Sequence, residues 1–211
     1  MSDLLRRKTE HLDVVLAQNV RTLPSTGFET VRFEHVALPE LDLDEIDLST
    51  EFLGRQMRAP FLISSMTGGP EKAAAINENL ARAAGQLGIA FAVGSQRVAI
   101  EEAGASGFGP ELRGFIGEMP LISNFGAAQL ARPDGTDMAR RAVDMIGADA
   151  LIIHLNPLQE AVQPGGDRNW SRLLARLEAL TKAIPVPVIA KEVGSGISGR
   201  LAKRLWEAGV T

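Results

Sequence analysis

The stretch 148-ADALIIHLNPLQE-160 decides the fold class. Residues 150–155 form an apolar run of the kind found in strands that are buried on both faces of a parallel sheet. Alternate strand residues share a face, so we expect His154 and Asn156 to point the same way as Ile152, into the open end of a barrel. Four polar side chains gather where this strand stops and Pro157 leads into a loop: His154, Asn156, Gln159 and Glu160. A single histidine or glutamate there is commonly structural, but four convergent groups favour a ligand site.

Strand and helix patterns alternate on both sides of this stretch. Strands are predicted at 59–65, 88–94, 120–126, 148–155 and 186–193, with a Gly-rich insertion between the second and third. Helices are predicted at about 71–87, 136–146, 169–183 and from 198 onward. This alternation predicts an α/β fold, the first five β/α units of a TIM (β/α)8 barrel, over residues 59–211. An open five-stranded doubly wound sheet is the structural alternative.

The first 58 residues do not follow this alternation. Residues 3–20 have the apolar spacing of an amphipathic helix, and 28–58 are irregular, with a hairpin suggested around 46–54. We therefore expect an extension, 1–58, followed by the partial barrel, 59–211. A complete barrel needs about 250 residues, so we expect the chain to be C-terminally incomplete.

Composition excludes several functional classes. The 211 residues are 45 % hydrophobic and 23 % charged and contain no cysteine, which rules out disulfides, thiolate metal sites and a cysteine nucleophile within them. No signal-peptide pattern or membrane-spanning apolar run is found, so a cytoplasmic protein without a membrane partner is expected. The net charge of −4 argues against nucleic acid as a partner. An anionic ligand would need local cations, and Arg6, Arg7 and Lys8 form such a cluster, although a solvated helix face is its commoner meaning.

The residue types at the strand ends suit a phosphorylated ligand. His154 can donate to phosphate oxygens, Asn156 and Gln159 are neutral donors, and the single carboxylate of Glu160 suits Mg²⁺ held together with substrate phosphates. These are too few ligands for zinc. Arg97 follows the second strand as another phosphate partner.

A flavin is the second ligand that the strand ends suggest. Lys191 ends the last strand, where its charge could offset a reduced flavin, although a lysine reaching to the rim is the plain alternative. Ser95 and Asn124 could hydrogen-bond the ring, and 64-SSMTGG-69 would let backbone N–H groups approach it, unless these glycines form a simple turn.

Six motifs together resemble one known family. They are RKTEHL (7–12), SSMTGG (64–69), GSQR (94–97), SNFGA (123–127), HLNPLQE (154–160) and AKEVG (190–194). In this order and spacing they resemble the type 2 isopentenyl-diphosphate delta-isomerases, which are FMN-dependent TIM-barrel enzymes that interconvert isopentenyl and dimethylallyl diphosphate in isoprenoid biosynthesis. The resemblance covers the chain from Arg7 to its last residue.

The resemblance implies a set of site residues and cofactors. FMN, active when reduced, would contact Ser65, Met66, Thr67, Ser95, Asn124 and Lys191. The diphosphate substrate would be lined by Arg7, Lys8, Ser95, Gln96, Arg97, His154, Asn156 and Gln159. His154 and Gln159 would be catalytic, with Gln159 placed near the alkene because an amide is a poor acid and base, and Glu160 would hold Mg²⁺. NADPH as reductant and a homo-octamer are also implied.

Two other functions remain open at this point. An FMN-dependent oxidoreductase of the 2-hydroxy-acid oxidase type could use the same barrel. It would need carboxylate-binding arginines and a catalytic histidine, and the diphosphate-type set of Arg7, Lys8 and Glu160 disfavours it. A non-enzymatic remnant that only assembles is the third hypothesis, because its open barrel edges would need a partner to cover them.

Overall fold

The computed structural model describes residues 13, 14, 17, 25, 27–65, 71–101 and 107–211. The chain forms two compact units, 1–48 and 49–211, which are described separately. Residues 13, 14 and 17 are helical, and the rest of the helix expected at 3–20 lies outside the described residues.

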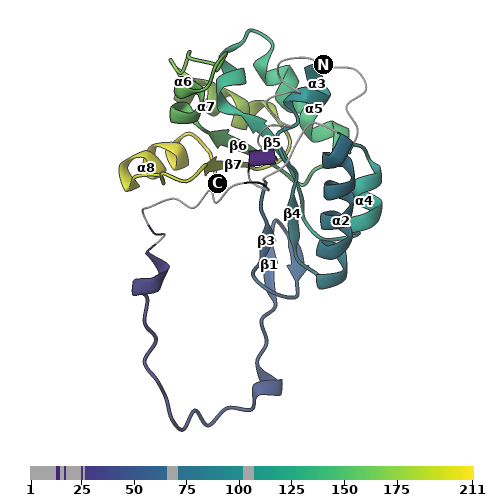
Figure 1. Cartoon of the computed structure of the whole chain (residues 1–211), viewed down its shortest axis with the longest axis vertical. Helices are drawn as coiled ribbons and strands as arrows, with labels where there is room; N and C mark the ends of the chain where they lie inside the picture. The colour runs from purple at the N-terminus through teal and green to yellow at the C-terminus, as the bar shows by residue number, and fades with distance from the viewer. Residues whose placement is uncertain (1–12, 15–16, 18–24, 26, 66–70, 102–106) are drawn as a thin grey trace. The chain divides into compact units, whose positions relative to one another are not determined.

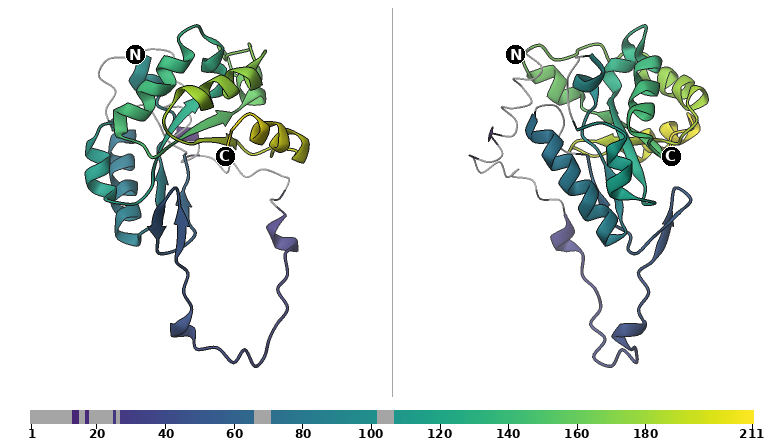
Figure 2. Two further views of the ribbon diagram at one scale, coloured as in Figure 1. Left: turned by 180° about the vertical axis from the view of Figure 1, so that it is seen from behind. Right: turned by 90° about the vertical axis from the view of Figure 1, so that its right-hand side faces the viewer.

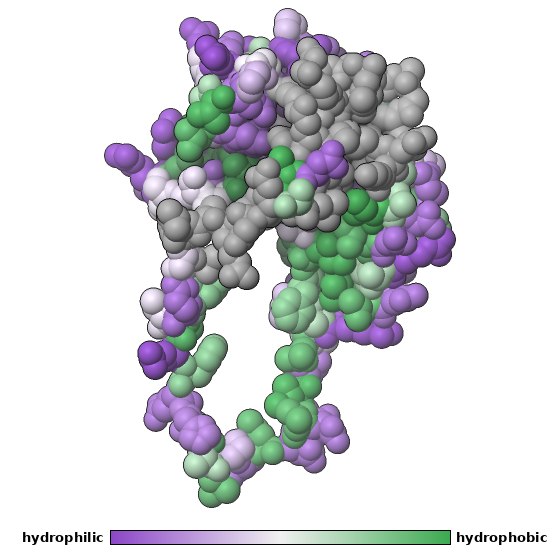
Figure 3. All heavy atoms as spheres, in the orientation of Figure 1, coloured by the Kyte–Doolittle hydropathy of each residue, from purple (hydrophilic) through white to green (hydrophobic). Residues whose placement is uncertain are grey.

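The described part of the first unit is an extended segment with two short 3₁₀ turns. These are η1 (Phe28–Thr30) and η2 (Leu43–Glu45), and neither contains a buried residue. Its apolar side chains lie open along its length, with Phe33 92 % and Leu43 81 % exposed (Figure 3). The described residues of this segment therefore do not bury one another's apolar side chains.

The second unit is built on a five-stranded sheet. Its strands are β3 (Leu62–Ile63), β4 (Ala90–Ala92), β5 (Leu121–Gly126), β6 (Ala150–Leu155) and β7 (Val188–Glu192). All neighbouring pairs are parallel, and the spatial order follows the chain order (Figure 1). A doubly wound sheet reverses its strand order at a switch point, whereas this sheet never does. The fold is therefore a partial TIM barrel, as predicted.

Helices connect successive strands. They are α2 (Glu71–Leu87), α3 (Arg97–Glu101), α4 (Glu111–Ile116), η3 (Ala127–Ala131), α5 (Gly135–Ile146), α6 (Pro157–Val162), α7 (Leu173–Ala183) and α8 (Gly199–Glu207). Figure 2 shows the longer helices on the outer side of the curled sheet. Within the described residues none is both long and apolar enough to cross a bilayer.

The Gly-rich insertion, for which no elements were predicted, contains two short helices, α3 and α4. Two local predictions were wrong. Helix α7 begins at Leu173 instead of 169, because Arg172 before it is left-handed (φ 55°) and the Asn169 side chain accepts from the Ser171 N–H. Residues after Pro157 form helix α6 instead of a loop.

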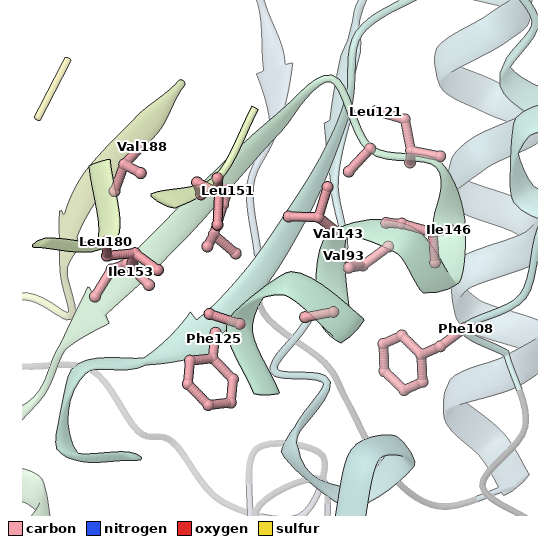
Figure 4. Close-up of a cluster of buried hydrophobic side chains, with 14 of the residues drawn as sticks. Val93, Phe108, Leu121, Phe125, Val143, Ile146, Leu151, Ile153, Leu180 and Val188 are labelled. Atoms are coloured by element: carbon pink, nitrogen blue, oxygen red, sulfur yellow. The ribbon is translucent and has the colours of Figure 1, made fainter. Parts of the chain in front are cut away.

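The two faces of the sheet carry separate apolar clusters. Phe125, Leu151 and Ile153 pack outward against the helices, in the cluster shown in Figure 4. Ile122 and Ile152 belong to a smaller cluster on the other face. The alternation read from the sequence, with Ile152 inward and its neighbours outward, is confirmed.

An antiparallel hairpin covers the amino-terminal end of the inner face. Strands β1 (Thr50–Phe52) and β2 (Arg55–Met57) are joined by Leu53 and Gly54, both at positive φ, as in a type I′ turn. Phe52 and Leu53 pack against the inner cluster. The hairpin predicted near 46–54 is thus present, and it leaves the carboxyl ends of the strands as the open end.

Candidate functional site

The carboxyl ends of β5, β6 and β7 bring three polar side chains to the inner face. His154 is in register with Gly126 on one side and Lys191 on the other, and Asn124 is in register with Ile152. Parallel partners in register point to the same side of a sheet. Nδ1 of His154 lies 2.7 Å from Oδ1 of Asn124. The amide oxygen can only accept, so Nδ1 of His154 carries the proton in this contact.

Lys191 contributes a half-buried cation to this row. Its Nζ donates to the carbonyl oxygen of Glu192 at 3.2 Å. Burial lowers the pKa of Lys191, and the nearby Glu192 carboxylate only partly opposes this. A buried ammonium in such a position is stabilised by any anion that binds beside it. The row therefore suits a ligand with a negatively charged edge.

The β6–α6 junction forms the polar part next to this row. Pro157 stands at the first turn of α6, where its missing N–H costs no hydrogen bond. The Asn156 side-chain amide donates to Gln159 Oε1 at 3.1 Å and to Glu160 Oε1 at 3.0 Å. One short helix thus places an amide, a second amide and a carboxylate together.

Glu160 is buried with both carboxylate oxygens engaged. Oε1 accepts from Asn156, and Oε2 accepts from the Gln163 side chain at 3.0 Å and the Asp167 backbone N–H at 2.7 Å. Across the described ranges no three His, Asp or Glu side chains group as a metal site. A lone carboxylate with amide oxygens beside it fits Mg²⁺ only when substrate phosphates supply further ligands. This donor set is compatible with a metal that arrives with a diphosphate.

Gln96 supports the site from behind. Its side chain is fully buried, donates to the carbonyl of Ala142 at 2.8 Å, and accepts from Ser123 Oγ at 2.5 Å and the Asn124 N–H at 3.0 Å. These contacts hold the end of β5 in place. The predicted contact of Gln96 with the substrate stays a prediction.

Arg97 is held by two carboxylates. Its Nε pairs with Glu101 at 3.2 Å and its Nη1 with Asp167 Oδ2 at 2.6 Å. Burial opposes the charge, but Glu101 and Asp167 outweigh it and raise the pKa of Arg97. The guanidinium is therefore a permanent cation whose orientation is already set.

Sequence reasoning missed Asp167 and Gln129, which meet at this arginine. Gln129 Nε2 donates to Asp167 Oδ2 at 2.8 Å, the oxygen that also receives Arg97. A signal was available in 164-PGGDR-168, since paired glycines before a charged residue mark a tight loop where backbones approach closely.

The remaining predicted residues are only partly described. Arg7, Lys8, Met66 and Thr67 lie outside the described residues. Ser95 is half-buried, three residues after the end of β4. Ser65 is buried, and within the described part of the chain its Oγ has no hydrogen-bond partner. A buried hydroxyl without a partner fits a wall that a polar ligand such as a flavin completes.

Family comparison points to flavin proteins. The family model described as FMN-dependent dehydrogenase matches residues 18–115. The chain resembles a solved mandelate oxidase mutant with an FMN adduct, with a TM-score of 0.61 and 18 % identity over 99 % of this chain and 65 % of that chain. It also resembles a chimera of (S)-mandelate dehydrogenase, with a TM-score of 0.58 and 19 % identity over 85 % of this chain and 57 % of that one. At these identities the likeness shows the fold alone.

Curated relatives are much more similar in sequence. A protein of Stutzerimonas stutzeri named isopentenyl-diphosphate delta-isomerase is 60 % identical over 98 % of this chain and 60 % of its own length. Proteins of the same name from Xanthobacter autotrophicus and a Synechocystis strain are 57 % and 52 % identical, over 97 % and 100 % of this chain and 60 % of their own lengths. The chain thus spans about three fifths of these relatives. Over nearly its whole length, the chain is therefore similar in sequence to proteins named isopentenyl-diphosphate delta-isomerase.

Proposed function

We propose that this protein interconverts isopentenyl and dimethylallyl diphosphate, with reduced FMN as an acid–base cofactor and with Mg²⁺. The observation that carries the proposal is the row of Asn124, His154 and Lys191 beside the carboxylate of Glu160. The row suits a flavin edge, and the carboxylate with its amides suits a magnesium diphosphate. The identity to isopentenyl-diphosphate delta-isomerases over nearly the whole chain supports this assignment.

The flavin side of the site is assigned to Lys191, Asn124, Ser65 and Ser95, with Met66 and Thr67 from the sequence motif. Reduced FMN, when bound, supplies the proton carrier at its N5 that an alkene isomerisation needs. Lys191 offsets the negative charge of that cofactor, and its pKa, which burial lowers, rises again beside an anion. Asn124 accepts from His154, so the histidine ring is held in one orientation.

The diphosphate side is assigned to Arg97, His154, Asn156 and Gln159, together with Arg7 and Lys8. Glu160 holds Mg²⁺, and the Asn156 amide, which donates to Glu160 and Gln159, fixes the orientation of both side chains. The transition state of double-bond transposition develops positive charge on carbon, so fixed anionic and amide groups near the alkene lower its energy. Gln159 is exposed on α6, free to face the substrate chain, and His154 with Gln159 forms the catalytic pair of the proposal.

The proposal extends to the setting of the enzyme. NADPH is the proposed reductant of the flavin, a homo-octamer is the proposed assembly, and the cytoplasm is the proposed location. The absence of cysteine from the 211 residues is compatible with a reducing compartment. The division into an extension, 1–58, and a partial barrel, 59–211, is part of the same proposal.

Turnover under anaerobic conditions tests the proposal. The protein, FMN, dithionite, Mg²⁺ and isopentenyl diphosphate are incubated, and dimethylallyl diphosphate is followed by proton NMR. We expect product only when the flavin is reduced, and loss of product when Mg²⁺ is chelated. His154→Ala should abolish product while the flavin spectrum of the sample stays that of bound FMN. Equal product with oxidised FMN would refute the proposed role of the cofactor.

An FMN-dependent oxidoreductase is the second candidate, favoured by the matching family model and the mandelate oxidase fold. Such an enzyme would transfer a hydride from a 2-hydroxy acid to the flavin and bleach its absorbance. A scan of oxidised flavin with mandelate or lactate separates the two functions. Bleaching by either acid would favour the oxidoreductase, and an unchanged spectrum favours the isomerase.

A further inference from the structure

Asp167 connects three successive loops at the carboxyl end of the sheet. Its Oδ2 accepts from Arg97, which begins α3 after β4, at 2.6 Å. The same oxygen accepts from Gln129, in η3 after β5, at 2.8 Å. Its backbone N–H donates to Glu160, in α6 after β6, at 2.7 Å. A single residue therefore binds one side chain from each of three consecutive β/α connections.

The loop that carries Asp167 lies tightly against α6. A Cβ on Gly166 would stand 2.0 Å from the backbone carbonyl oxygen of Glu160, so only glycine allows this approach. The indole N–H of Trp170 donates to the Asp167 carbonyl at 2.9 Å and secures the other side of the loop. The backbone N–H of Asp167 is thereby kept at hydrogen-bonding distance from the Glu160 carboxylate.

Gln129 packs equally closely against the backbone at the end of β5. A Cβ on Gly126 would stand 2.0 Å from Gln129 Oε1, so the amide lies directly over the glycine that ends β5. Gln129 is only 4 % exposed, and its Nε2 reaches Asp167. The end of the strand that carries Asn124 is thus connected to the Asp167 carboxylate.

The charges show why an aspartate is needed at this point. Arg97 lies between Glu101 and Asp167, and Glu101 also accepts from Arg132 at 2.6 Å. Without the Asp167 carboxylate, Arg97 would be held by Glu101 alone, on its own helix, with no connection to α6. An asparagine can replace the shape of Asp167 but not the charge-assisted bond to the guanidinium.

We infer that Asp167 is a positioning residue that holds the cation of Arg97 and the carboxylate of Glu160 in one arrangement for a magnesium diphosphate. The inference rests on the proposed function, because it assigns these two groups to the same ligand. Asp167 itself touches neither metal nor phosphate: its carboxylate orients the arginine and its backbone N–H orients the glutamate. A residue that merely fastened a loop would alter stability without changing affinity for this ligand in particular.

Calorimetric titration tests the inference with Mg²⁺ and inorganic pyrophosphate as the probe. The full chain, loaded with FMN, is compared with Asp167→Asn, Asp167→Glu and Asp137→Asn. Asp137 pairs with Arg140 on the exposed side of α5, where its side chain is 77 % exposed, and is the matched control. We expect Asp167→Asn to weaken pyrophosphate binding by about tenfold or more, the usual effect of losing a residue that orients a metal ligand. Asp167→Glu should recover part of the affinity, and Asp137→Asn should leave it unchanged.

Two further readouts separate positioning from folding. The affinity for FMN should be the same in all four proteins, and in turnover Asp167→Asn should raise KM for the diphosphate with little change in kcat. Should Asp167→Asn not fold, Gly166→Ala provides a second test, because it keeps every charge and displaces only the loop. It is expected to weaken pyrophosphate binding in the same direction.

The outcomes distinguish this inference from the proposed function. Equal pyrophosphate affinity in Asp167→Asn and the parent chain would overturn the inference, and so would absence of binding to the parent. If binding is weakened as expected but reduced FMN supports no isomerisation, the positioning role stands and the proposed reaction fails. If isomerisation occurs and the variants bind equally, the reaction stands and the positioning role fails.

Discussion

Asp149→Asn is expected to loosen the connection between the hairpin and the barrel. Asp149 precedes β6 at the amino-terminal end of the sheet, and its side chain is only 15 % exposed. Its Oδ1 accepts from Arg55 at 2.9 Å, and its Oδ2 accepts from Arg113 at 2.7 Å and from the Leu121 N–H at 2.8 Å. The carboxylate therefore joins the hairpin, α4 and the start of β5.

The size of the effect follows from the two arginine contacts. A hydrogen bond to a charged group contributes about 1.5–3 kcal/mol. Asparagine keeps an acceptor for Leu121 but removes the charge that both guanidinium groups face. Arg55 and Arg113 are 32 % and 30 % exposed, so water replaces part of what they lose. We expect a loss of about 2 kcal/mol in the free energy of unfolding, roughly a thirtyfold change in the folding equilibrium.

Urea unfolding followed by circular dichroism measures this loss. Asp137→Asn is the control, since its ion pair with Arg140 is 3.4 Å long and exposed and should contribute less than about 0.5 kcal/mol. A loss for Asp149→Asn no larger than that of the control would refute the reasoning that this carboxylate holds the hairpin to the sheet.

Three further predictions concern pH, the cofactor cation and a helix cap. Burial raises the pKa of Asp149, but the Leu121 N–H and Arg113 outweigh burial and lower the pKa below its ordinary 3.8. The stability that the Asp149 carboxylate contributes is therefore complete above pH 3.8 and is lost as the pH falls through the lower pKa of the folded state. The urea midpoints of the parent and of Asp149→Asn should therefore converge in acid. Lys191→Met should not lower stability at pH 7, because burial disfavours the ammonium, yet should weaken reduced FMN about tenfold relative to oxidised FMN in anaerobic titration. Ser198→Ala removes the side chain that caps α8 through the Leu201 N–H and should cost about 1 kcal/mol in urea unfolding.

Local sequence patterns were sufficient for most of the barrel. Each predicted strand contains an observed one, and the faces of β6 follow from alternation alone, with Ile152 inward and Leu151 and Ile153 outward. This succeeds because side-chain direction in a strand depends only on position along it. The polar residues that follow the strands were predicted to lie near one another, because all carboxyl ends of a parallel sheet lie at the same edge. The short helices α3, α4 and α6 were not predicted, because six residues or fewer are too short to show the helical repeat of apolar residues.

Long-range partners were decided only by the tertiary structure. Arg55 and Asp149 are 94 positions apart, and Arg97 and Asp167 are 70 apart, so no local pattern connects them. The hydrogen bond from Gln96 to the carbonyl of Ala142 likewise joins residues 46 positions apart, and only the packing of α5 against the sheet brings them together. The sequence by itself therefore determines which residues reach the open end of the barrel, since that depends on periodicity along each strand. The structure decides which of them are held in place by others, because that depends on how close the loops come to one another.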